Sequence, residues 1–195
     1  MTQPHTIPDL KAELRREALA KRDAIPPDVR AAAAEAVAAR PLPVAVAPGA
    51  VVSAYSPIRS EINPLPLMRR FADAGAQLAL PAIAGRGMPL ILRGWTFGAP
   101  LARGQWGIRE PGPEAPQVHP DIMIVPLAAF DRRGYRIGYG AGYYDLTLNA
   151  ARARKKVIAI GLAYGSQEIA AVPNHGHDAR LDLVLTETDV IHCEA

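Results

Sequence analysis

Cysteine is almost absent from this sequence, because Cys193 is the only one among 195 residues. No intrachain disulfide can form, so nothing in the chain requires an oxidising compartment. The sequence also lacks a run of about 18 apolar residues and a basic segment followed by an apolar signal core. We therefore expect a cytoplasmic chain that has no contact with a membrane.

Charge of one sign is not concentrated in any part of the chain. Lys and Arg number 22 and Asp and Glu number 19, which gives a net charge of +3, and the basic residues are scattered rather than gathered into an arm. An RNA-associated protein would need a basic and aromatic platform, and the sequence offers none. We expect anionic small molecules as partners, no nucleic acid, and a monomer in preference to an oligomer.

Short apolar strands alternate with helices along the chain. Strands are expected at 50–55, 77–81, 88–97, 121–130, 156–164 and 181–191, and helices at 8–25, 27–40, 64–75 and 143–154. This alternation predicts an α/β fold, a three-layer αβα sandwich around a largely parallel central sheet with N-terminal helices, in which residues 1–195 form one domain. Ligands of such sheets bind beyond the carboxyl ends of the strands, where Ser56, Glu61 and residues 134–145 would lie.

Residues 134–145 read GYRIGYGAGYYD and lie between a predicted strand and a predicted helix. Neither GxxxxGK[ST] nor the dinucleotide pattern GxGxxG fits this stretch. Backbone N–H groups and the start of the helix could still bind an anion, and the alternative is a mobile glycine turn. Arg132, Arg133 and Arg136 precede the glycines and favour a phosphate, which Arg136 could contact with two hydrogen bonds.

Aspartates that could hold a metal follow two of the predicted elements. Asp145 begins the predicted helix and is either a dipole partner or a ligand of Mg²⁺, which takes one or two protein carboxylates. Asp178 could form a second oxygen site with Asp182 behind it, whereas His175 and His177 lack HExxH spacing and are better explained as exposed loop residues. Trp106 could stack on a flat ligand or cap the core.

The sequence resembles the 5-formyltetrahydrofolate cyclo-ligase family over nearly its whole length. The resemblance is carried by KAELR, SPIRSEINP, WGIREP, VPLAAFDRRGYRIGYGAGYYD and PNHGHDARLDLVLTE, in that order. It implies an ATP- and Mg²⁺-dependent ligase that converts 5-formyltetrahydrofolate to 5,10-methenyltetrahydrofolate with release of ADP and phosphate. The implied route is phosphorylation of the formyl oxygen, attack by N10 and loss of phosphate.

The resemblance also assigns roles to individual residues. Lys11 and Arg15 would reach the ATP phosphates, and Asp145 and Asp178 would hold magnesium. The main ATP loop would consist of Arg136, Gly138, Tyr139, Gly140, Ala141, Gly142, Tyr143 and Tyr144, of which Arg136 and Tyr144 would be catalytic. Ser56, Glu61, Trp106 and Tyr144 would bind the folate, with Glu61 hydrogen-bonded to pterin nitrogens.

The sequence departs from some relatives at two positions of the glycine stretch. Tyr139 stands where they have arginine, and Ala141 stands where they have lysine or glycine. Arg132, Arg133 or Lys11 would then supply the missing charge, and Ala141 restricts a backbone position that glycine would leave free. These departures motivate an alternative, a non-catalytic folate- or nucleotide-binding protein on the same scaffold.

Overall fold

A seven-stranded sheet forms the centre of the computed structural model, which describes residues 6–194. The strand order is β11-β10-β9-β6-β1-β2-β3. These strands are β1 (Val51–Ser53), β2 (Gln77–Ala82), β3 (Ile91–Trp95), β6 (Ile122–Pro126), β9 (Ile158–Leu162), β10 (Leu183–Leu185) and β11 (Val190–His192). The five inner strands are parallel, and the edge strands β3 and β11 pair antiparallel with β2 and β10. The largely parallel sheet expected from the sequence is confirmed.

The other elements surround this sheet. The helices are α1 (Ile7–Asp23), α2 (Pro27–Ala39), α3 (Leu65–Asp73) and α4 (Tyr143–Arg152). The short elements are β4 (Ala102–Arg103), η1 (Gln105–Gly107), β5 (Arg109–Glu110), β7 (Ala129–Phe130), β8 (Arg136–Ile137) and η2 (Gly165–Gln167). The four predicted helices all form, although α1, α3 and α4 each end two residues earlier than expected.

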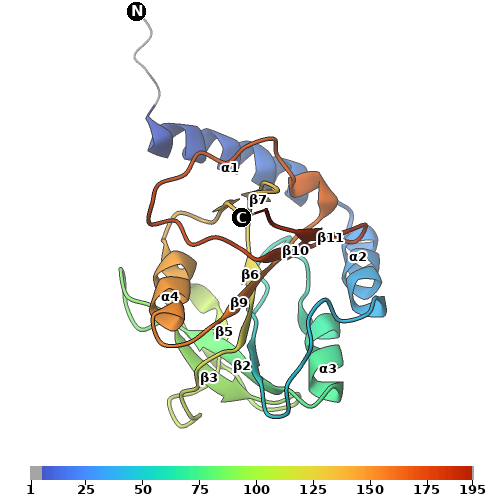
Figure 1. Ribbon diagram of the computed structural model, residues 1–195, viewed down its shortest axis with the longest axis vertical. Helices are drawn as coiled ribbons and strands as arrows, with labels where there is room; N and C mark the ends of the chain where they lie inside the picture. Colours follow the sequence, from blue (N-terminus) through green and yellow to red (C-terminus); the bar gives the residue numbers. More distant parts are fainter. Residues whose placement is uncertain (1–5, 195) are drawn as a thin grey trace, which may run out of the picture.

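Helices cover both faces of the sheet, which makes three layers (Figure 1). Alternate residues of each strand point to opposite faces. In β6, Ile124 packs into the cluster shared with α2 and α3, and Val125 packs into the cluster shared with α4. Phe71 of α3 and Leu148 of α4 are fully buried, one on each side. The predicted αβα sandwich is therefore confirmed.

Helix α1 lies across the carboxyl ends of the strands rather than along a face (Figure 1). It begins at Thr6, whose side chain accepts a hydrogen bond from the Asp9 backbone N–H in a capping box, with a proline in the first turn. The helix contacts β7, β8 and η2, all of which follow central strands. This position brings one face of α1 over the end of the sheet where ligands bind.

The order of the strands reverses at β1, because the chain places β2 on one side of it and later β6 on the other. A reversal of this kind leaves a crevice beyond the carboxyl ends of the two strands. The segments that follow β1 and β6 contain Glu61 and the glycine stretch. Among residues 6–194, every helix is too short or too polar to cross a membrane.

Candidate active site

A cavity of about 830 Å³ opens at this crevice. Its volume is at the upper end of the range for small-molecule sites, enough for more than one ligand. The lining includes all the residues that the resemblance assigns to ATP, folate or metal: Lys11, Arg15, Ser56, Glu61, Trp106, Arg136, Gly138, Tyr139, Gly140, Ala141, Gly142, Tyr143, Tyr144, Asp145 and Asp178. Residues far apart in the sequence therefore meet around one space.

The glycine stretch forms the wall of the cavity between β8 and α4. Gly140 and Gly142 have φ angles of 101° and 70°, a region in which side chains other than glycine are strained. Gly142 is the residue before the first turn of α4, so the unpaired N–H groups of that turn open beside the cavity. Ala141 lies outside the left-handed region, so the alanine there causes no backbone strain.

One face of α1 carries cations into the cavity. Lys11, Arg15 and Arg22 follow one another at intervals of four and seven residues, which places them on the same side of the helix. The Arg15 Nε atom donates to the Gly138 carbonyl oxygen at 2.6 Å, and the guanidinium lies beside Gly140. Burial lowers the pKa of Arg15 from its usual value. The two side chains Lys11 and Arg15 supply positive charge to the glycine loop.

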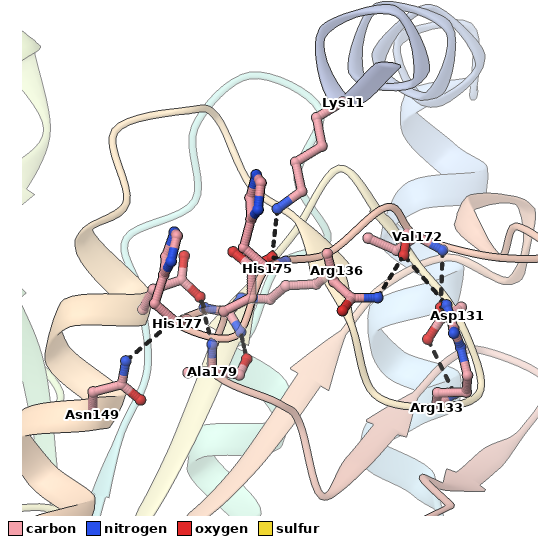
Figure 2. A network of polar contacts seen from close by, with 12 residues as sticks. Lys11, Asp131, Arg133, Arg136, Asn149, Val172, His175, His177 and Ala179 are labelled. Carbon is pink, nitrogen blue, oxygen red and sulfur yellow. Dashed lines mark hydrogen bonds and ion pairs between the residues drawn. The ribbon is translucent and has the colours of Figure 1, made fainter. Parts of the chain in front are cut away.

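Lys11 and Arg136 each pair with one of the two candidate metal ligands. Figure 2 shows Lys11 and Arg136 in one network of polar contacts. Lys11 Nζ lies 2.6 Å from Asp178 Oδ2, which also accepts the His175 backbone N–H at 2.8 Å. Arg136 Nη2 lies 2.9 Å from Asp145 Oδ1, which also accepts the Ala179 backbone N–H at 3.0 Å. In each aspartate these contacts fall on one oxygen, which leaves the other oxygen for a cation.

Asp145 and Asp178 suit Mg²⁺ as a donor set, because that ion binds oxygen and takes only one or two carboxylates from a protein. No group of three or more His, Cys, Asp or Glu side chains in the described part of the chain is placed to enclose a metal. The remaining ligands would be water and phosphate oxygens. The geometry fits an ion that arrives with a nucleotide better than a permanently caged one.

The cavity lining also includes Ser56, Glu61 and Trp106. Trp106 is 73% exposed, with φ of 55°, and its ring centre lies 6.0 Å from that of Tyr143. Its large exposure contradicts the alternative of a core-capping tryptophan. Burial raises the pKa of Glu61 to about 7, although the Ile58 backbone N–H, Arg22 and Tyr139 each lower it.

Similarity to known proteins covers almost the whole chain. Residues 8–187 match the model of the 5-formyltetrahydrofolate cyclo-ligase family. The chain belongs to this family. A 5-formyltetrahydrofolate cyclo-ligase of Mycolicibacterium smegmatis is 34% identical over 187 residues, which cover 92% of this chain and 94% of the relative. A cyclo-ligase of Escherichia coli is 29% identical over 71% of this chain and 79% of its own length.

Solved structures of the cyclo-ligase family have the same fold. The NMR structure of Aquifex aeolicus 5,10-methenyltetrahydrofolate synthetase has a TM-score of 0.78 and 32% identity, and the match covers 95% of this chain and 94% of that one. The Mycoplasma pneumoniae synthetase has a TM-score of 0.67 and 21% identity over 91% and 98% of the two chains, which supports the fold alone.

Some charged residues near the cyclo-ligase motifs lie away from the cavity. Arg132 pairs with Glu168 at 2.7 Å, and Arg133 pairs with Asp131 at 2.7 Å, so the expectation that they supply charge to the ATP loop is wrong. Their side chains are held by these carboxylates, and neither residue lines the cavity. Lys11 and Arg15 line the cavity instead.

The expectation for the segment that contains His175 and His177 is also corrected by the structure. Asp182 pairs with Arg152 at 2.8 Å and accepts the Ala159 backbone N–H, so it is not placed behind Asp178. His175 and His177 stack on each other with ring centres 5.3 Å apart. His177 is exposed and lines the cavity beside Asp178, whereas His175 is half-buried.

Arg22 is a buried residue of the site region that the sequence analysis did not identify. It is 1% exposed, and its partners Ser60, Leu127 and Tyr139 lie 38, 105 and 117 residues away in the sequence. The sequence held one indication of this role, because Arg22 lies on the same face of the predicted helix as Lys11. A basic residue that continues an apolar stripe is a reason to look for a buried partner.

Proposed function

We propose that this chain cyclises 5-formyltetrahydrofolate to 5,10-methenyltetrahydrofolate in an ATP- and Mg²⁺-dependent reaction that releases ADP and phosphate. One observation carries the proposal: the glycine loop, the α1 cations Lys11 and Arg15, the Glu61 carboxyl group and the exposed Trp106 indole all line a single cavity. Membership in the cyclo-ligase family supports the same reaction. Transfer between two substrates requires such a shared space.

ATP would place its phosphates between the glycine loop and α1. Free N–H groups at the start of α4 point to this region, and Lys11 and Arg15 face it from the other side. Arg15 is fixed by its hydrogen bond to the Gly138 carbonyl, so its charge is already oriented before ATP binds. Arg136 is committed to Asp145 and the Ala179 carbonyl, so we assign it the task of positioning Asp145.

Magnesium would be held by Asp145 and Asp178 together with phosphate oxygens. When bound, it would neutralise charge on the transferred phosphoryl group. Lys11 Nζ pairs with Asp178. Because Lys11 is a flexible cation, it can leave the carboxylate for a phosphate as a cation takes its place.

The folate would occupy the part of the cavity that Ser56, Glu61 and Trp106 line. Its pterin ring is flat and carries N–H groups, which suits stacking against Trp106 and hydrogen bonding to Glu61. Ser56 Oγ donates to the Arg109 carbonyl at 2.5 Å, which joins the segment after β1 to the β4–β5 ribbon beside Trp106. This contact holds the two sides of the proposed folate pocket together.

The reaction needs positioning more than it needs a protein nucleophile. The formyl oxygen takes the γ-phosphoryl group of ATP and becomes a good leaving group. N10 then attacks the formyl carbon and the five-membered ring closes. The bond from that carbon to the phosphorylated oxygen breaks, and phosphate departs with the proton that N10 gives up. The cations from α1 and the helix N-terminus stabilise the negative charge that moves through these steps.

The test is an absorbance assay with 5-formyltetrahydrofolate, ATP and Mg²⁺. We expect the near-ultraviolet absorbance of the methenyl product to appear only when all three are present. Folded protein that gives no absorbance would refute the proposal, and tight folate binding without ATP consumption would instead support a binding protein.

A matched pair of variants tests the ATP end of the cavity. Arg15→Gln should raise the KM for ATP by about 10-fold, since one charge-assisted contact to a phosphate is lost. Arg16→Gln is the control, because its exposed side chain has only a weak pair with Glu13 at 3.8 Å. Equal effects of the two substitutions on the KM for ATP would exclude the assigned position of the phosphates.

A further inference from the structure

Arg22 is a buried cation whose hydrogen bonds connect three parts of the chain. Nε donates to Ser60 Oγ at 3.0 Å, Nη1 to the Leu127 carbonyl at 3.4 Å, and Nη2 to the Tyr139 hydroxyl at 2.5 Å. Ser60 in turn donates to Asp23. A buried charge is costly unless its donors are satisfied, so this arrangement fixes the guanidinium in one orientation.

The Tyr139 hydroxyl lies between Arg22 and Glu61. A tyrosine hydroxyl has one hydrogen to donate. Because its oxygen accepts a hydrogen bond from Arg22, that hydrogen remains available for the Glu61 carboxylate, with which Tyr139 also interacts. The Tyr139 ring centre lies 5.5 Å from the Arg22 guanidinium carbon, so the cation also holds the ring.

Glu61 is surrounded by ionisable groups from several elements. Arg22 comes from α1, Tyr139 from the glycine loop and Tyr144 from α4, while Tyr55 follows β1 and Tyr164 follows β9. Arg22 is the single cation of this set, and burial opposes the ionised carboxyl. The Ile58 backbone N–H donates to Glu61 Oε2 at 2.9 Å. Tyr139 and Arg22 are therefore the side chains that favour the carboxylate.

We propose that Arg22 and Tyr139 are positioning residues for Glu61: Arg22 orients the Tyr139 hydroxyl toward the Glu61 carboxyl group, which is thereby oriented to accept N–H groups of the pterin. This inference rests on the proposed function, and it moves Tyr139 from the ATP end of the cavity to the folate end. The tyrosine found here where some relatives have arginine then has a defined task.

The first test needs no substrate. Glutamate carboxyl carbons labelled with ¹³C are titrated by NMR in the ligand-free protein, and Glu61→Gln identifies the Glu61 signal. Tyr139→Phe should raise the Glu61 midpoint by about one pH unit, because one hydrogen bond to the charged form is lost. Tyr135→Phe is the matched control and should leave the midpoint unchanged, since that tyrosine packs against Arg133 and Arg180.

The second test follows the KM for 5-formyltetrahydrofolate against pH. In the parent protein this KM should fall as Glu61 ionises, and in Tyr139→Phe the fall should occur at a pH higher by the same amount as in the NMR titration. The KM for ATP should change by less than about twofold. Arg22→Lys should give an intermediate shift because it retains the charge but not the fork of donors.

Two results would overturn the inference. One is an unchanged Glu61 midpoint in Tyr139→Phe, and the other is a variant whose KM rises for ATP but not for the folate. If Arg22→Lys does not fold, Tyr139→Phe decides the question, since phenylalanine keeps the ring. A parent protein without turnover would refute the proposed function, while the NMR titration would still test the contact between Tyr139 and Glu61.

Discussion

Asp145 serves the fold and the proposed metal at the same time. Its Oδ1 accepts hydrogen bonds from Arg136 and from the Ala179 backbone, and the Arg136 side chain is only 3% exposed. Removing the carboxylate would leave a buried cation without its ion-pair partner, which is strongly destabilising. Substitution by alanine would therefore mix a loss of stability with any loss of metal.

Asp145→Asn separates the two effects, because asparagine keeps an oxygen for Arg136 and Ala179 but loses the charge. We expect it to cost about 1–2 kcal/mol of unfolding free energy, against about 3 kcal/mol or more for Asp145→Ala. Activity at a fixed Mg²⁺ concentration should fall by about 10-fold or more. Urea unfolding and rates over a range of Mg²⁺ concentrations measure both; an Asn variant with an unchanged Mg²⁺ dependence would remove Asp145 from the metal site.

Single residues could be predicted where a local motif surrounds them. The glycine stretch, Glu61 and Asp178 were found because each belongs to a segment with its own pattern. Arg22 was missed because its partners come from β1, β6 and β8 regions that the sequence does not place beside α1. The wrong expectation for Arg132 and Arg133 has a different origin, because Arg132 pairs with Glu168 and Arg133 pairs with its sequence neighbour Asp131.

The glycine loop and α4 form one element in which backbone conformation sets the position of the N–H groups. Gly142 is left-handed and comes directly before the first turn of α4. Gly138 is not left-handed, and a Cβ atom added there would meet no atom within 4 Å. Substitution by alanine is therefore expected to lower the free energy of unfolding more at Gly142 than at Gly138.

Gly142→Ala should destabilise the protein by about 1–2 kcal/mol, because alanine is strained at a φ of 70°. Gly138→Ala should change the unfolding free energy by less than about 0.5 kcal/mol. Thermal or urea unfolding of the two variants gives the comparison. Equal stability of both would mean that the loop changes its conformation without cost.

Elements long enough to show a hydrophobic pattern in the sequence were predicted. Elements too short to show one were not. Strands such as β3, β6 and β9 lie within the expected apolar runs. The ribbons β4–β5 and β7–β8 have two-residue strands, too short for a pattern to show. The packing around the cavity determines which segments pair in these two ribbons.

At the scale of the whole molecule, the site lowers the stability of the fold that carries it. Placing Glu61 in a buried position raises its pKa from 4.5 to about 7. Between these values the unfolded chain has lost the proton that the folded chain keeps. Stability from this group is complete below about pH 4.5, declines as the pH rises to about 7, and is constant above it.

Glu61→Gln should therefore stabilise the protein more at pH 8 than at pH 5. A shift of this size corresponds to at most about 3 kcal/mol between the two ends of the window. Urea unfolding at several pH values measures the difference between the variant and the parent. A constant difference from pH 5 to pH 8 would show that Glu61 titrates normally in the folded protein.

The overall architecture was predictable from sequence because alternating strands and helices allow few packings. The location of the site beyond the strand ends followed from the same rule. The position of α1 did not follow, because a helix with a modest apolar face carries no information about which edge of a sheet it covers. The structure shows that this helix closes the cavity.

The position of α1 has a consequence for folding during synthesis. Lys11 and its partner Asp178 are 167 residues apart in the sequence. Arg22 donates hydrogen bonds to Leu127 and Tyr139, which are synthesised much later than α1. A ribosome therefore exports this helix long before the segments that it must contact exist outside the exit tunnel. Non-local contacts of this kind form late. The nascent chain carries an uncovered basic helix through most of translation, and the cavity is completed only after the last central strand has emerged.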